Sequence, residues 1–133
     1  MKTISKLKKE LDKWFSLYIR LRNSTPQGIV KCYTCGTSKH YKKMQAGHFQ
    51  SRRFLSTRWH EENVQVQCVR CNMFNQGEQY LFGKLLDVRI KEGTSSKLEL
   101  LAKSTVKIMR HEYEDMIKEY KQKVKNEQSR ISE

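Results

Sequence analysis

All four cysteines of the 133-residue chain occur in two Cys-x-x-Cys pairs, and this spacing suits a tetrahedral metal site. The pairs are Cys32 with Cys35 and Cys68 with Cys71, and 32 residues separate them. A tight turn brings both thiolates of such a pair to ~2.3 Å from one zinc ion. Two disulfides are the alternative, but the N-terminus has no apolar run typical of a secretion signal, and disulfides are rare inside cells. We therefore predict a structural zinc site with four cysteine ligands.

Three candidate catalytic residues, one histidine and two asparagines, lie within or directly after the segment between the cysteine pairs. His48 ends the run Gln45-Ala-Gly-His48, Asn63 follows fifteen residues later, and Asn72 comes directly after Cys71. This order suits a ββα-metal nuclease, in which a histidine on the first strand acts as a general base and a residue at the start of the helix binds a catalytic metal. The plainer alternatives are a His48 that only packs and an Asn72 that caps a helix.

The charge of the chain predicts a polyanionic partner. Lys and Arg total 27 against 14 Asp and Glu, which gives a formal net charge of +13. The segment from Lys13 to His60 contains no acidic residue and ten basic ones, whereas residues 97–133 carry a nearly balanced mixture. We expect nucleic acid to bind in the first two thirds of the chain and the last third to be an ordinary solvated helix. A ribosomal-type or merely soluble basic protein is the alternative.

The elements that must position these residues are predicted to form one helix-rich α+β domain over residues 1–133. One Pro and six Gly argue against an all-β fold. A zinc-bound ββα nuclease core is flanked by an N-terminal and a C-terminal helix in this prediction, and the last residues fray. The expected ranges are a helix at 4–22, the core at 29–90 with strands near 29–33, 44–49 and 64–66, a helix at 96–125 and a frayed tail at 126–133.

The N-terminal helix carries an apolar stripe that needs a partner. Its members recur at 3-4-3-4-3 spacing: Ile4, Leu7, Leu11, Trp14, Tyr18 and Leu21. The stripe packs on its own domain or serves self-association. Because the two long helices offer more apolar surface than a small core covers, we expect a homodimer. No apolar run approaches the ~20 residues of a membrane helix, so no membrane partner is expected.

Three runs of residues resemble the phage NinG/Rap recombination proteins. They are Cys32-Tyr-Thr-Cys35-Gly36, Gln45-Ala-Gly-His48-Phe-Gln-Ser-Arg52, and Glu62-Asn63-Val-Gln-Val-Gln-Cys68-Val-Arg-Cys71-Asn72. More distantly, the layout is similar to HNH (His-Me finger) nucleases and to the phage resolvase endonuclease VII. The resemblance implies a metal-dependent, structure-selective endonuclease that cuts branched DNA such as Holliday junctions and D-loops. It also implies a phage or prophage protein in the host cytoplasm, with other phage recombination proteins as partners.

The resemblance also implies roles for single residues. His48 is the general base, Asn72 is a ligand of a catalytic Mg²⁺ or Mn²⁺, Asn63 holds the loop that orients His48, and Arg52 clamps a phosphate. Further DNA-binding candidates are Arg53, Arg58, Lys39, Lys42 and Lys43.

The chain departs from the nuclease pattern at Gly47. Many HNH enzymes place Asp or His there as a second metal ligand. Replacements possible by residue type are Gln45, His60, Glu61, Glu62, Asn75 and Glu78, or the ion is held by Asn72, water and DNA phosphate alone. The glycine is the best support for the competing function, a zinc-stapled DNA-binding module without catalysis. An HNH restriction or homing nuclease is a third possibility.

Overall fold

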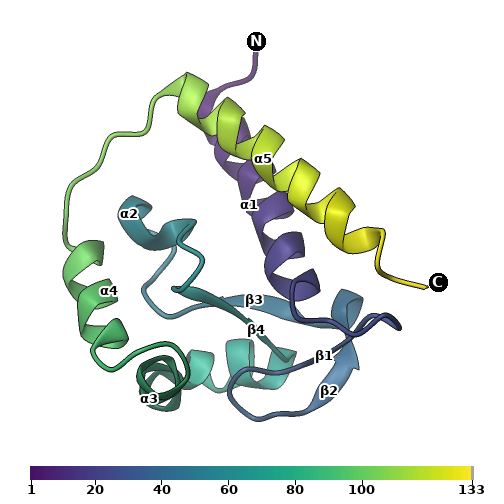
Figure 1. Ribbon diagram of the computed structural model, residues 1–133. Helices are drawn as coiled ribbons and strands as arrows, with labels where there is room; N and C mark the ends of the chain where they lie inside the picture. Colours follow the sequence, from purple (N-terminus) through teal and green to yellow (C-terminus); the bar gives the residue numbers. More distant parts are fainter. Residues whose placement is uncertain (133) are drawn as a thin grey trace.

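The computed structural model describes residues 1–132 and has an α+β, helix-rich architecture. Two long helices, α1 (Ile4–Leu21) and α5 (Arg110–Gln128), lie side by side along one flank (Figure 1). Two small antiparallel ribbons, β1 (Ile29–Lys31) with β2 (Ser38–His40) and β3 (Gln45–His48) with β4 (Val64–Gln67), lie below them. The four-residue helix α2 (Leu55–Arg58) follows β3 and precedes β4 along the chain. The remaining helices are η1 (Tyr41–Lys43), η2 (Arg70–Phe74), η3 (Gln76–Glu78), α3 (Gln79–Arg89) and α4 (Thr94–Ala102).

Helices α1 and α5 run parallel and bury the apolar stripe of α1 within one chain. Arg110 at the start of α5 donates to the carbonyl of Lys2, and Arg130 beyond its end donates to the carbonyl of Leu21. Between these ends, Phe15 packs edge-on against Tyr120 with ring centroids 4.9 Å apart. The buried face of α1 is rotated relative to the predicted apolar stripe. Phe15 and Ile19 are buried, whereas Trp14 and Tyr18 of the stripe are only partly buried.

This packing changes the basis for the expected homodimer. The buried members of α1 and α5 contact each other and the β3–β4 ribbon, in a cluster of Leu7, Leu11, Phe15, Ile19, Trp59, Val64, Tyr113, Ile117 and Tyr120. The apolar faces therefore cover one another inside the protomer, as the packing alternative for the stripe requires. The apolar surface of the two helices is therefore no longer a reason to expect a homodimer.

The predicted helix over 96–125 is two helices in the structure. Helix α4 ends at Ala102, and α5 begins at Arg110 after a non-helical link. The two helices pack against different clusters: Leu98 of α4 joins Phe82 and Leu86 of α3, whereas α5 packs on α1. One straight helix would not reach both clusters. The start of α5 is stabilised because the Glu112 side chain accepts from the backbone N–H of Met109.

The predicted fraying is also wrong for residues 126–132, and Glu133 lies outside the described residues. Helix α5 continues to Gln128, and the Arg130 guanidinium donates to the carbonyl oxygens of Leu21 and Ser24. Ile131 packs against the second apolar cluster, beside the β1–β2 ribbon. These contacts hold the tail as far as Ser132, whose N–H donates to the carbonyl of Pro26.

None of the helices among residues 1–132 is both long enough and apolar enough to cross a membrane.

Candidate active site and metal centre

The four cysteines come together where the two ribbons meet. Cys32 follows β1, Cys35 lies in the turn before β2, and Cys68 and Cys71 lie at the passage from β4 into η2. The turn after Cys35 needs a residue with positive φ, and Gly36 supplies it at +78°. The four Sγ atoms all lie within 4.8 Å of one another, and those of Cys35 and Cys68 are 3.7 Å apart.

This sulfur cluster fits a structural zinc ion. Tetrahedral coordination at ~2.3 Å places sulfurs about 3.8 Å apart, close to the Cys35–Cys68 separation. Burial raises the pKa of Cys71 to about 12, and the thiolate of Cys32 adds to this because like charges repel. A divalent cation removes that penalty, since it stabilises the thiolate form of every ligand. The four thiolates would close the coordination sphere, so the zinc would be a structural tie with no open position for substrate.

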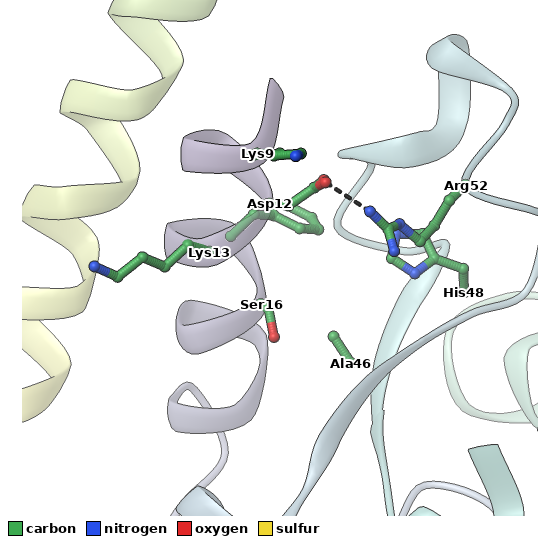
Figure 2. A pocket seen from close by; sticks show the side chains of 8 residues that line it. Lys9, Asp12, Lys13, Ser16, Ala46, His48 and Arg52 are labelled. Carbon is green, nitrogen blue, oxygen red and sulfur yellow. Dashed lines mark hydrogen bonds and ion pairs between the residues drawn. The ribbon is translucent and has the colours of Figure 1, made fainter. Parts of the chain in front are cut away.

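His48 lines a pocket between β3 and α1 that is rich in cations. The pocket has a volume of about 280 Å³ and is lined by Lys9, Asp12, Lys13, Phe15, Ser16, Ala46, His48 and Arg52 (Figure 2). Helix α1 supplies five of these side chains. The N-terminal helix, predicted only as a flanking element, therefore forms one wall of the His48 site.

Asp12 organises this pocket, although sequence reasoning missed it. Its carboxylate accepts two hydrogen bonds from Arg58, at 3.1 and 2.6 Å, one from Arg52 at 2.8 Å and one from the Trp59 indole at 2.9 Å. Burial favours the protonated form, but the hydrogen bonds and charges of the two arginines outweigh it and hold the pKa of Asp12 below its ordinary value. The only signal in the sequence is that Asp12 is the last acidic residue before the acid-free segment.

The hydrogen bond of His48 determines which ring nitrogen is free. Its Nε2 lies 2.9 Å from the carbonyl oxygen of Arg58, and because a carbonyl only accepts, Nε2 carries the proton. Nδ1 then holds the lone pair. Burial lowers the pKa of His48 below its ordinary value, and Arg52 and Arg58 lower it further against the opposing effects of the Arg58 carbonyl and Asp12. The imidazole is therefore neutral at pH 7 and able to accept a proton at Nδ1.

Asn63 is a buried clamp on the loop after β3. Its side-chain oxygen accepts from the backbone N–H of Gln50 at 2.7 Å, and its amide nitrogen donates to the carbonyls of Gln50 and Thr57. These bonds tie α2 to the end of β3 and so position Arg58, the hydrogen-bond partner of His48. Asn63 therefore holds this loop, and its role in orienting His48 stays a prediction.

Asn72 lies on the opposite face of the ribbon from His48. Its amide donates to Gln45 Oε1 at 2.8 Å, and Gln45 is three residues before His48 on β3. Side chains alternate across a strand, so residues 45 and 47 face η2 and residues 46 and 48 face α1. The structure therefore does not bring Asn72 and His48 into one pocket.

The space that a side chain at position 47 would occupy is filled by the side chain of Gln67. A Cβ added to Gly47 would lie 1.8 Å from Gln67 Oε1, so the glycine is required for the buried Gln67 side chain to cross the ribbon. The Gln67 amide nitrogen donates to Thr34 and to the carbonyl of Gly77, while Oε1 has no hydrogen-bond partner. The absence of a side chain at position 47 therefore serves the packing of Gln67.

The side chains around His48 do not by themselves fit a magnesium or manganese site. Mg²⁺ uses one or two carboxylates together with waters and phosphates. The one carboxylate of the pocket, Asp12, has both oxygens engaged by Arg52, Arg58 and Trp59. Two of the suggested replacements are also engaged: Glu61 accepts from Tyr120 and Lys123, and Glu62 pairs with Lys97. Among the described residues, the cysteines form the one cluster of metal-ligating His, Cys, Asp and Glu side chains.

The basic residues expected to bind DNA fall into two groups. Arg52 and Arg58 converge on Asp12 beside His48, and Arg53 is exposed on the same loop with its guanidinium over the Phe54 ring. The second group, Lys39, Lys42 and Lys43, is exposed on β2 and η1, outside the His48 pocket.

The fold and the site together define an α+β protein with a four-cysteine centre and a cationic pocket around a neutral histidine. Residues 1–130 match the family model of the bacteriophage lambda NinG protein. The chain therefore belongs to the NinG family and is a phage recombination-related protein. Comparisons with curated proteins and with solved structures give no match.

Replacing Cys68 by serine tests the metal centre. The variant loses one thiolate of the cluster that joins the two ribbons, so we expect loss of bound zinc and of the folded state, seen by metal analysis and circular dichroism. Chelating the zinc from the wild-type protein should have the same effect. A folded Cys68→Ser variant with one full equivalent of zinc would contradict the assignment of all four cysteines as ligands.

Proposed function

We propose that this protein is a structure-selective endonuclease that hydrolyses phosphodiester bonds in branched recombination intermediates, with His48 as the general base. Family membership supports the recombination setting. The observation that carries the catalytic proposal is the state of His48: neutral, with Nε2–H held by the Arg58 carbonyl and Nδ1 free, in a pocket lined by Lys9, Lys13 and Arg52.

In the proposed reaction, Nδ1 of His48 takes a proton from a water molecule as its oxygen attacks phosphorus. The new phosphorus–oxygen bond forms as the bond to the 3′ oxygen breaks, and the leaving oxygen takes a proton from solvent. Arg52 binds a phosphate oxygen after exchanging its partner Asp12 for the DNA, since its side chain is 61% exposed and free to turn. The Arg58–Asp12 pair is more deeply buried and keeps the carbonyl of Arg58 on Nε2.

The proposal also includes a catalytic divalent ion, which the resemblance to nucleases implies. Asn72 would offer it one amide oxygen, and DNA phosphate and water would supply most of its other ligands, as is common for Mg²⁺. Because Asn72 lies across the ribbon from His48, the proposed reaction assigns no step to such an ion.

The second candidate is a DNA-binding module without catalysis. Gly47 favours it, because its lack of a side chain serves the packing of Gln67 and leaves no ligand at that position. Cleavage assays on a four-way junction and on a linear duplex of the same sequence separate the two candidates.

His48→Ala should abolish junction cleavage and leave DNA affinity nearly unchanged. A general base acts in the transition state and typically contributes ~10²–10⁴-fold in rate, so residual activity should be about one per cent or less. The matched control is His111→Ala, which removes an exposed histidine from α5. Single-turnover cleavage and binding by fluorescence anisotropy measure the two effects. Wild-type cleavage by His48→Ala would leave the binding module as the better candidate.

Cleavage should also report the lowered pKa of His48. Protonation blocks Nδ1, so kcat/KM should fall as the pH drops, with an apparent pKa below 6.5. Asp12 raises the pKa of His48, so Asp12→Asn should move this acid limb to lower pH. Arg52 and Arg58 are the other charges that act on the ring, and both remain in that variant. An acid limb above pH 6.5, or one that Asp12→Asn leaves in place, would contradict the assignment.

We propose that two copies act on one junction. Each 15.9 kDa protomer carries one His48 site, and resolving a four-way junction needs two cuts at positions related by a two-fold axis. Sedimentation of the protein with an uncleaved junction should give two protomers per junction. One protomer per junction at saturating protein would contradict this stoichiometry.

A further inference from the structure

Helices α1 and α5 form a groove lined by lysines on the side of α1 away from His48. The groove has a volume of about 330 Å³ and is lined by Trp14, Lys118, Lys121, Gln122, Lys125 and Gln128. Among residues 1–132, no acidic side chain lines it. Its floor is the ring of Trp14, with the Nζ of Lys13 at 5.0 Å and the Nζ of Lys121 at 5.6 Å from the ring centroid.

Most cations of this groove have no anionic partner in the protein. Lys121 pairs with Glu10 at 3.4 Å, but Lys13, Lys118 and Lys125 form no ion pair within residues 1–132 and are exposed. Glu114 lies one turn before Lys118 on the same face of α5 and marks where the cationic row begins. Unpaired like charges gathered in one groove repel each other, so this arrangement favours an anionic ligand.

The groove is connected to the His48 pocket through α1. Lys13 belongs to the lining of that pocket, and its side chain extends away from His48 toward α5 (Figure 2). A cationic surface therefore runs from Arg52 and Lys9 over Lys13 to the lysines of α5. The last third of the sequence, expected to be only a solvated helix, completes this surface.

Resting on the proposed function, we propose that the α1–α5 groove binds the phosphate backbone of a second arm of the branched DNA while the first arm lies at His48. The spacing fits a backbone: Lys118 to Lys125 spans seven residues, about 10.5 Å along the helix axis. Phosphates of one strand follow each other every ~3.4 Å of duplex axis, so the row matches about three of them. A linear duplex occupies one arm position only, so the groove contributes to preference for branched DNA.

The test replaces Lys118, Lys121 and Lys125 by glutamine together. Binding of a four-way junction is measured by fluorescence anisotropy across a range of salt concentrations, in buffer without Mg²⁺, Mn²⁺ or chelator so that the zinc stays bound. We expect at least tenfold weaker binding at moderate salt and a log–log salt slope about 2.7 smaller in magnitude, since each lost phosphate contact contributes about 0.9. Binding of a short linear duplex should change much less.

Two controls isolate the groove. A matched triple variant, Lys91→Gln with Lys103→Gln and Lys107→Gln, removes the same charge from exposed positions in the two segments that flank α4. It should leave the slope within one unit of wild type. The triple change of the groove lysines to arginine should keep wild-type affinity. Equal losses of junction affinity in the two glutamine variants would show that only net charge matters and would overturn the proposal.

The outcome is independent of catalysis. The assay measures binding and requires no cleavage, so a failure of His48→Ala to stop cleavage does not affect this measurement. Unchanged junction binding together with lost binding of polyglutamate would overturn the proposal and assign the groove to an acidic polypeptide.

Discussion

The carboxylate of Asp12 is the interaction on which the candidate active site depends. It is the last acidic residue before a segment with ten cations, and it accepts hydrogen bonds from Arg52, Arg58 and Trp59. These bonds attach the loop after β3 to α1, and the carbonyl of Arg58 then orients His48. A single anion on a helix thus neutralises the most repulsive part of the chain and sets the tautomer of the proposed base.

The cysteine cluster and the parallel helix pair stabilise the two ribbons, which are too small to be stable alone. Strands of three or four residues bury too little apolar surface to be stable alone. The cysteines tie the two ribbons together at one end, and α1 with α5 covers the face that carries Ala46 and His48. The opposite face receives η2 and the buried Gln67, which is why Gly47 carries no side chain there.

The same helix pair distributes the positive charge over the surface. The face of α1 toward β3 places Lys9 beside His48, Lys13 extends from the edge of this pocket toward α5, and the other side of α1 forms the lysine-lined groove with α5. Acidic residues near these helices pair with specific cations, such as Glu61 with Lys123 and Glu10 with Lys2 and Lys121. Lys9, Lys13, Lys118 and Lys125 form no ion pair within residues 1–132 and share one connected surface next to the proposed catalytic group, which would attract a polyanion.

Local patterns in the sequence determined the features that depend on short-range spacing. The two Cys-x-x-Cys pairs predicted the sulfur cluster, the apolar period predicted α1 almost to the residue, and the run ending at His48 predicted a strand. The family resemblance was likewise contained in residues 32–72. Only the tertiary structure decided what depends on long-range packing: the break between α4 and α5, the ordered tail, and the faces to which His48 and Asn72 point. Asp12 becomes part of the site, and the lysines of α5 part of the surface, because α1 packs against both β3 and α5, a contact between distant segments that no local pattern encodes.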